Sequence, residues 1–540
     1  MASVNAEDFL VELNHVLTQD DMIKGQLLME SFALLDGKAQ NQVLGELTRS
    51  NTGTAISLLA HLVVSPVTYA VPSLVIRSML LKSGLENPGH LLALLDNPAY
   101  LDKEILVQII GEMEYAEAVS ALLKILDSSQ DRELLKAVIQ ALGTIGSQET
   151  IVTISEYLYS GSRELVVAAI QALANIDSES SVRYLAERMG TDSDLDLLIL
   201  DGFAKLQDQL ALDELAGALN SPHAHIRNRA RTNLIKIGLK AIPTLTANLA
   251  DSDPDLLILT LNVLGFIGDD SAVRAIRQLL HDEPEDANVR FAAYEALGML
   301  PLKSGSYVLA DGLTDKEDHV QIATAKAIER NCTDILIAGV ENMVQQGGRE
   351  AERVVAAFLN AEAYKVVMRI VELKEFQELA VDFLLSKAHP DLRNQFARLF
   401  RDNGYADLAR RITPDEEAGV DKLLVYAVDD SRMILSIYKN VLFQIGVDSR
   451  LFEFPASAIE QVKKEKPDLI FTDLNMPDIT GIELTENIRA LYSKEELPII
   501  MVTTQGENPD HEEAIRVGVN QILHKPFTAE ELQAAMSEVR

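Results

Sequence analysis

Most of the chain carries an apolar pattern that returns at a nearly constant interval. An apolar residue followed by glycine or another small residue recurs along the sequence, with successive spacings of 30, 32, 31, 30, 31, 30, 33, 31 and 31 residues. Such a period predicts stacked structural repeats, because a single unit cannot bury its own apolar face. The recurring positions are Leu80, Ile110, Leu142, Leu173, Phe203, Leu234, Leu264, Leu297, Ile328 and Leu359.

Each repeat is predicted to contain two helices. Residues 118–129, AVSALLKILDSS, form a short helix that ends at a polar break, and residues 131–146, DRELLKAVIQALGTIG, form a second. The second segment has the i, i+3, i+4, i+7 apolar spacing of an amphipathic helix, and we expect it to stop at Gly143 and Gly146. Helical pairs of this kind stack into a superhelix with long exposed surfaces.

The repeat pattern is clear from about residue 70 to residue 360, and helical caps of less regular sequence flank it. We therefore expect a helical solenoid over residues 1–412. Pro414 and Gly419 then interrupt the helical pattern, which places a linker at 413–420. Residues 421–540 form a second domain.

The hydrophobic period changes after residue 422. Short apolar runs rich in β-branched residues lie at 423–428, 468–472, 498–503 and 521–525, and helical stretches separate them. The last of these stretches opens with a capping box, Thr528 to Glu531. Alternating strands and helices predict an α/β domain with a parallel sheet covered on both faces.

Polar residues stand at the carboxyl ends of these predicted strands, where sheets of this type form their sites. Carboxylates that meet in one pocket repel one another unless a hard cation joins them, so we expect Mg²⁺ there. The residues are Asp429 and Asp430 after the run at 423–428, Asp473 after the run at 468–472, Thr503 and Thr504 at the end of the run at 498–503, and Lys525, followed by Pro526, at the end of the run at 521–525.

The order DD…D…T…KP, with intervals of 43, 30 and 22 residues, resembles the receiver domains of response regulators, and the match runs from about 422 to 540. The resemblance is to single-domain, chemotaxis-type receivers, and it implies a doubly wound, flavodoxin-like fold with five parallel strands. It implies that Asp473 accepts a phosphoryl group. It also implies that Asp430, Asp473 and the Asn475 backbone carbonyl bind Mg²⁺, with Asp429 acting through water. Thr503 and Lys525 would contact the phosphoryl oxygens, and Thr504 and Pro526, the latter after a cis peptide bond, would support them.

One position departs from the pattern of many receivers. An aromatic residue commonly lies three positions before the lysine and turns inward when the threonine moves toward phosphate, but Ile522 stands there in this chain. The phosphorylation chemistry should survive, because Ile522 need not touch the phosphoryl group. The coupling between the site and the binding face is the property that this departure puts in question.

The repeats resemble HEAT repeats through their Asp-rich turn, amphipathic helix, Ala-Leu pair and Ile-Gly ending. Their period of about 31 residues is shorter than the usual ~40–47, and similar short HEAT-like repeats occur in phycobilisome lyases. Within the repeats, residues 223–240 form a basic segment in which Arg227 and Arg231 share one helix face. These arginines either dock an acidic partner or pair with carboxylates of the adjacent repeat.

Charge narrows the class of partner. The net charge of −34 is shared by both parts of the chain and disfavours binding to nucleic acid or to an anionic membrane surface. The uncharged run at 56–76 contains Pro66 and Pro72, so we read it as two packed helices joined at Ser65 and Pro66 rather than as a membrane span. A single cysteine, Cys332, and an acidic N-terminus favour a cytoplasmic protein.

The leading functional hypothesis is a two-component phosphorelay protein that takes a phosphoryl group from a sensor histidine kinase or a phosphotransfer protein. No other module follows the receiver-like segment, so the solenoid is the expected effector, and its output would be regulated protein binding rather than catalysis beyond a weak autophosphatase activity. One alternative is a phosphate sink that the solenoid merely localises. Another is a chromophore lyase, which the lone Cys332 and the lack of a His/Glu cluster disfavour.

Overall fold

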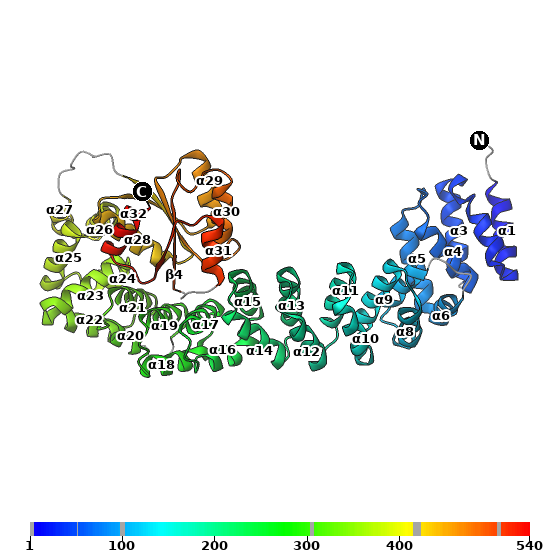
Figure 1. The fold of residues 1–540 in the computed structure, drawn as a ribbon, viewed down its shortest axis with the longest axis horizontal. Helices are drawn as coiled ribbons and strands as arrows, with labels where there is room; N and C mark the ends of the chain where they lie inside the picture. Colours follow the sequence, from blue (N-terminus) through cyan, green and yellow to red (C-terminus); the bar gives the residue numbers. More distant parts are fainter. Residues whose placement is uncertain are drawn as a thin grey trace. The chain divides into compact units, whose positions relative to one another are not determined.

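The computed structural model describes residues 5–50, 52–97, 103–302, 307–413, 423–504 and 509–539. These form two compact units, Met1–Ala211 and Leu212–Arg540. The first unit is helical, and the second contains further helices and a five-stranded sheet (Figure 1). The predicted linker at 413–420 lies outside the described residues except for Thr413, so its boundaries stay a prediction.

Paired helices form the first unit. The residues that set the predicted period lie in the cores of the helical pairs of both units. All ten of these positions, five in each unit, have no exposed surface. Burial of one large apolar side chain contributes about 1.5–3 kcal/mol to stability, so each of these periodic residues stabilises its own repeat. The helices of this unit are α1 Ala6–Gln19, α2 Met22–Met29, α3 Gly37–Ser50, α4 Gly53–Val64, α5 Ser73–Glu86, α6 Pro88–Asp96, α7 Lys103–Glu112, α8 Val119–Ser128, α9 Arg132–Ile145, α10 Ile151–Glu156, α11 Arg163–Leu173, α12 Glu179–Arg188 and α13 Ser193–Leu206.

The prediction that α9 stops at Gly143 was wrong, and the reason is helix packing. Gly143 lies inside α9, which continues to Ile145 and is capped by Gly146 in the left-handed conformation. A Cβ at Gly143 would lie 2.4 Å from the Cα of Ala172 in α11. The glycine therefore lets two second helices of neighbouring repeats approach closely, and it does not break the helix.

The uncharged run at 56–76 forms parts of two helices, as predicted, but the connection between them extends from Ser65 to Pro72 rather than lying at Ser65 and Pro66 alone. Helix α4 ends at Val64, and α5 begins only at Ser73, so both prolines lie between them. Among the residues that the structure describes, no helix is both long enough and apolar enough to cross a membrane.

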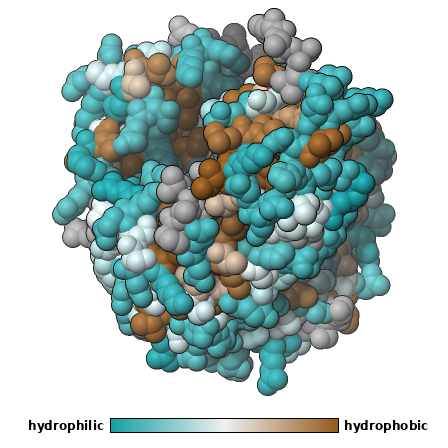
Figure 2. All heavy atoms as spheres, turned by 90° about the vertical axis from the view of Figure 1, so that its right-hand side faces the viewer, coloured by the Kyte–Doolittle hydropathy of each residue, from teal (hydrophilic) through white to brown (hydrophobic). Residues whose placement is uncertain are grey.

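Several large apolar side chains are exposed in the first helices. Val11 and Ile23 are about 70% exposed, and Leu74 is 77% exposed. Figure 2, which faces the end of the molecule where α1 lies, shows apolar groups gathered beside a hollow in an otherwise hydrophilic surface.

The second unit continues the helical pairs and then carries the α/β domain. Helix α14, Gln209–Gly217, spans the boundary between the two units. The helices that follow are α15 Ala224–Ile237, α16 Ile242–Asn248, α17 Pro254–Ile267, α18 Val273–His281, α19 Ala287–Met299, α20 Val308–Gly312, α21 Asp318–Arg330, α22 Asp334–Gln346, α23 Gly348–Asn360, α24 Tyr364–Ile370, α25 Lys374–Ser386, α26 Pro390–Asp402 and α27 Ala406–Arg411.

The predicted parallel sheet is confirmed, with five strands in the order β2-β1-β3-β4-β5. All four neighbouring pairs are parallel, and the register sets Val428 of β1 beside Thr472 of β3. The elements are β1 Leu424–Val428, α28 Arg432–Gln444, β2 Asp448–Phe452, α29 Pro455–Lys464, β3 Leu469–Asp473, α30 Gly481–Arg489, β4 Ile499–Thr503, α31 Pro509–Val517, β5 Gln521–His524 and α32 Ala529–Glu538.

Helices cover both faces of this sheet, and β1, β3 and β4 are apolar on both sides for that reason. Helices α28 and α32 pack on one face around Phe471, and α29 and α30 pack on the other around Tyr426 (Figure 1). The capping box at Thr528 and Glu531 is present at the start of α32. The order 2-1-3-4-5 is that of flavodoxin-like folds, whose sites lie beyond the carboxyl ends of β1 and β3.

Candidate functional site

Four of the predicted site residues meet at the carboxyl edge of the sheet. Asp429 and Asp430 follow β1, Asp473 is the last residue of β3, and Lys525 directly follows β5. Because β1 and β3 are adjacent, the acids on these two strands face one pocket. The sequence prediction that these side chains come together agrees with their positions.

Lys525 joins two of the acids. Its Nζ donates to Oδ2 of Asp429 at 2.6 Å and to Oδ1 of Asp473 at 2.9 Å. The other oxygen of Asp473 accepts from the backbone N–H of Asn475 at 2.9 Å. Both carboxylates are buried, so these bonds to charged groups are strong and fix the direction of the Asp473 side chain.

The pocket is short of positive charge for the number of acids that it buries. Burial and the neighbouring acids raise the pKa of Asp429 to about 7, against the opposing charge of Lys525. Burial also raises the pKa of Asp430, although Arg231 opposes this. Burial alone would lower the pKa of Lys525, but the carboxylates of Asp429 and Asp473 raise it well above its ordinary value. An additional cation would therefore stabilise the site.

The remaining predicted site residues lie around this cluster. Thr503 is fully buried at the end of β4, and its carbonyl accepts from the backbone N–H of Lys525 at 2.8 Å. Thr504 and Pro526 line the cavity in front of the acids, and the Lys525–Pro526 peptide bond is cis, as the resemblance implied.

Ile522, the position of the expected aromatic residue, lies in β5 and is half-buried. It packs against an apolar cluster that contains Leu474, Met501 and Ala514 of the α/β domain. The same cluster contains Ala224, the first residue of the solenoid helix α15. Ile522 therefore packs against a cluster to which the solenoid also contributes a residue.

Arg227 and Arg231, predicted to share a helix face, both reach the α/β domain from α15. Arg231 donates from both Nη atoms to Oδ2 of Asp430, each at 3.1 Å. Arg227 donates to Oδ1 of Asn475 at 2.7 Å and to Oδ2 of Asp510 at 2.9 Å. Their partners thus lie in the same chain but far away in the sequence, and the predicted role as a docking patch for another protein stays a prediction.

Two acidic residues near the site were missed by the sequence analysis. Asp510 of α31 accepts from Arg227 and also from the backbone N–H of Ala224, at 3.2 Å. Glu295 of α19 accepts from the hydroxyl of Ser431 at 3.3 Å. Burial and the carboxylate of Asp430 raise the pKa of Glu295 to about 7. No local motif marks either residue, because both act across long sequence separations.

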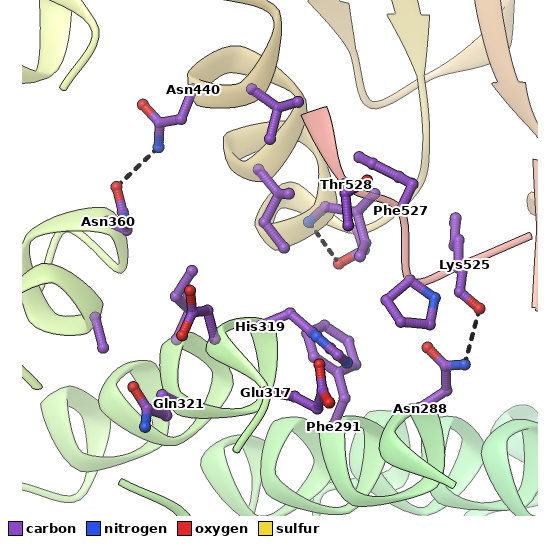
Figure 3. Close-up of a pocket in the computed structure, with 18 of the residues that line it drawn as sticks. Asn288, Phe291, Glu317, His319, Gln321, Asn360, Asn440, Lys525, Phe527 and Thr528 are labelled. Carbon is purple, nitrogen blue, oxygen red and sulfur yellow. Dashed lines mark hydrogen bonds between the residues drawn. The ribbon is translucent and has the colours of Figure 1, made fainter. Parts of the chain in front are cut away.

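The acids open into a cavity of about 1220 Å³ between the α/β domain and the solenoid helices of the second unit. In Figure 3, Phe291 on a solenoid helix and Phe527 of the α/β domain line opposite sides of this cavity. Asn288 donates to the backbone carbonyl of Lys525 at 3.0 Å, and Asn440 of α28 donates to Asn360 at 2.9 Å (Figure 3). The cavity exceeds the ~300–1,000 Å³ of common small-molecule sites, but it is far smaller than a protein domain.

The donor atoms fit Mg²⁺, although their present arrangement is held by side-chain cations. Carboxylate oxygens of Asp430 and Asp473 and the carbonyl of Asn475 are the oxygen ligands that this ion prefers. In the part of the chain that the structure describes, however, no group of three His, Cys, Asp or Glu side chains is arranged to hold a metal ion. Arg231 and Lys525 instead contact the carboxylate oxygens.

Comparison with known proteins separates the two parts of the chain. A family model for the response regulator receiver domain matches residues 425–537. A family model for HEAT repeats matches residues 88–174, 119–199 and 242–329.

The curated relatives match the C-terminal domain. A chemotaxis protein CheY homolog of Campylobacter jejuni is 40% identical over 120 residues, which are 22% of this chain and 91% of that protein. Chemotaxis protein CheY1 of Helicobacter pylori is 37% identical over 120 residues, which are 22% of this chain and 95% of that protein. Among solved structures, chemotaxis protein CheY4 of Vibrio cholerae is 30% identical with a TM-score of 0.21, covering 22% of this chain and 99% of that one.

Proposed function

The chain belongs to the response regulator receiver family, as its motif predicted, and on this premise we propose that it is a phosphorelay protein whose Asp473 accepts a phosphoryl group from a histidine kinase or a phosphotransfer protein. The observation that carries the proposal is the geometry at Asp473. Its carboxylate lies at the end of β3 and is held between Lys525 Nζ and the Asn475 N–H.

Transfer forms a bond between phosphorus and a carboxylate oxygen of Asp473, while the bond from phosphorus to the donor nitrogen breaks. Catalysis of such a step relies on position and charge, because little covalent assistance is needed. Lys525 is placed to neutralise the phosphoryl oxygens, and Thr503 to donate its hydroxyl. Thr504 and Pro526 line the approach to them.

The residues that would hold Mg²⁺ are Asp430, Asp473 and the backbone carbonyl of Asn475, with Asp429 acting through water. When bound, the ion supplies positive charge to the phosphoryl oxygens and to the crowded acids. The raised pKa values of Asp429 and Asp430 support this assignment, because they reflect buried acids that lack sufficient positive charge.

The HEAT-repeat resemblance is also confirmed, and the solenoid is the proposed output of the signal. A phosphoryl group adds close to two negative charges next to α15, where the solenoid contacts the receiver. We expect this charge to change the protein-binding surfaces of the solenoid. The charge of −34 supports protein rather than nucleic-acid partners, and the single cysteine supports a cytoplasmic location.

The proposed role is that of a phosphoacceptor rather than of an enzyme. The chromophore-lyase alternative would need a reactive pocket, and Cys332, the single cysteine of the sequence, is half-buried in the solenoid. Burial raises the pKa of its thiol, which disfavours the reactive thiolate.

Phosphorylation of the full chain with acetyl phosphate tests the proposal. Intact-mass measurement in the presence of Mg²⁺ should show the addition of one phosphoryl group that is stable in acid and labile in base. Asp473→Asn should abolish the mass gain. Asp448→Asn, at the start of β2 and away from the acids, serves as the matched control and should keep it.

A mass gain that persists in Asp473→Asn would contradict the assignment of Asp473 as the phosphoacceptor. Absence of a mass gain in both the wild type and Asp448→Asn would contradict the receiver function. The output is tested separately. A pull-down with the phosphorylated chain and with Asp473→Asn should capture different proteins if the solenoid is the effector, and identical sets would favour the phosphate sink.

A further inference from the structure

Helix α15 of the solenoid covers the receiver site with a positively charged face. Arg231 brings both Nη atoms to Asp430, and its guanidinium stacks on Phe266 of α17, 5.0 Å from the ring centre. The side chain is only 10% exposed. A planar group held by a ring on one side and a carboxylate on the other has little freedom, so Arg231 is positioned to occupy Asp430.

The same helix is anchored on both sides of this contact. Arg227 is 2% exposed and bonds to Asn475, two residues after the phosphoacceptor, and to Asp510. Asn228 donates to the carbonyl of Met476 at 2.8 Å. Helix α15 therefore holds the loop that follows β3 and one acid of the site at the same time.

We propose that α15 is a binding surface for the metal-free receiver, in which Arg231 takes the place of Mg²⁺ on Asp430, so that solenoid docking and metal binding compete. This inference rests on the Mg²⁺ site of the proposed function. Its first support is that Arg231 bonds to an acid which the receiver motif assigns to the ion. The second is that Arg231 and Lys525 already place cationic groups on the carboxylates of Asp430 and Asp473.

The competition follows from charge and from helix rigidity. A carboxylate oxygen that accepts two bonds from a guanidinium has less electron density to offer a divalent ion, and two cations on one oxygen repel each other. Release of Arg231 would loosen α15, because Arg227 and Asn228 lie on the same short segment of helix. Thermodynamic linkage requires the two effects to be equal: the factor by which docking through Arg231 lowers the affinity for Mg²⁺ is the factor by which bound Mg²⁺ lowers the docking equilibrium.

Calorimetric titration of Mg²⁺ into the full chain tests the metal side of this linkage. Arg231→Gln removes the competing charge and keeps a polar side chain. We expect its dissociation constant for Mg²⁺ to fall about tenfold, within the ~5- to 150-fold range of typical couplings. The matched control is Arg229→Gln, which makes the same charge change at an exposed position of the same helix and should leave the constant unchanged.

Hydrogen exchange tests the docking side without any phosphoryl donor. In the wild type, saturating Mg²⁺ should speed exchange of amides in α15 and α31, because docking weakens as the metal binds. In Arg231→Gln these amides should already exchange faster in the absence of Mg²⁺, and added metal should change them little. A second variant, Asn228→Ala, weakens docking without altering charge and should raise Mg²⁺ affinity in the same direction.

The outcomes separate this inference from the receiver function. Equal Mg²⁺ affinity in the wild type, Arg231→Gln and Asn228→Ala would overturn the competition and leave the Mg²⁺ site intact. Absence of Mg²⁺ binding in every variant would contradict the metal site itself. If Glu295→Gln weakened Mg²⁺ binding while Arg231→Gln did not strengthen it, the solenoid would be a source of ligands, and the competition would again be wrong.

Discussion

Two helices in equivalent positions of their repeats, α11 and α15, which α13 separates in the sequence, use arginine in opposite ways. Arg163 at the start of α11 pairs with Asp192 and Asp194 of the next repeat, and its side chain is 55% exposed. Arg227 near the start of α15 pairs with Asp510 of the receiver, and both side chains are 2% exposed. One contact joins repeat to repeat at the surface, and the other joins solenoid to receiver in the interior.

The difference shows that the partner, rather than the repeat motif, decides what an arginine contributes. Exposed pairs contribute little, because water and salt screen them. A buried pair is not necessarily a net gain, but removing one member leaves an isolated charge in a medium of low polarity. The solenoid thus keeps a common framework and concentrates its costly electrostatics where it meets the receiver.

The largest effect is expected from breaking the buried contact. Arg227→Ala leaves the carboxylate of Asp510 buried without its guanidinium partner, and we expect the free energy of local opening at α15 and α31 to fall by about 3–5 kcal/mol. Native-state hydrogen exchange of these helices measures the loss.

Two further variants complete this test. Arg163→Ala should leave exchange in α11 and α13 unchanged, since its pairs lie in solvent. Adding Asp510→Asn to Arg227→Ala should restore part of the loss, because the buried negative charge that Arg227 had balanced is gone. An equal loss in the Arg163 and Arg227 variants would erase the distinction between surface and interior contacts.

The second effect is a loss of folding stability as pH rises. Burial and Asp430 raise the pKa of Glu295 from its ordinary 4.5 to about 7. The folded protein therefore binds more protons than the unfolded chain between these values, so Glu295 makes stability fall as pH rises from about 4.5 to about 7, by roughly 3 kcal/mol in all. Above that range its effect is constant.

Hydrogen exchange in α19 as a function of pH, corrected for the intrinsic rate, checks this expectation. Glu295→Gln should flatten this part of the profile and gain most over wild type near neutral pH. The exposed Glu164→Gln in the first unit should follow the wild type. An unchanged slope in Glu295→Gln would assign the pH dependence to other groups.

The smallest effect is expected from a contact between repeats that is partly buried. Arg290 bonds to Asp315 of the next repeat through Nε and Nη2, and these side chains are 14% and 10% exposed. Arg290→Ala should cost about 1–2 kcal/mol in the opening of α19, between the values for exposed and buried pairs. A cost as large as that of Arg227→Ala would show that burial does not order these contacts.

Much of the fold follows from local patterns that the sequence displays. The ten apolar positions are fully buried because each serves the same place in its repeat. The location of β2 was not predicted, since its sequence DSRLF is partly polar at the edge of the sheet. Gly143 was misread because a glycine that admits a neighbouring helix and a glycine that ends a helix look alike along the chain.

The contacts of the site likewise divide into those that local patterns predict and those that they do not. Asp429, Asp473 and Lys525 could be placed together because strand ends in a parallel sheet share one edge. The contacts of Arg231 with Asp430 and of Glu295 with Ser431 span 199 and 136 residues and depend on how the receiver lies on the solenoid. No period or motif encodes such a distance, so only the folded unit reveals it.

The bond from Asn288 to the carbonyl of Lys525 has a consequence for how such proteins diversify. Receivers are often regarded as interchangeable modules that can be exchanged between output domains. In this chain, side chains of the repeats contact the backbone of Lys525 and the carboxylate of Asp430. A receiver from another protein would therefore lack matching partners for these side chains. A chimera would therefore need α15 and α19 to be transplanted along with the receiver.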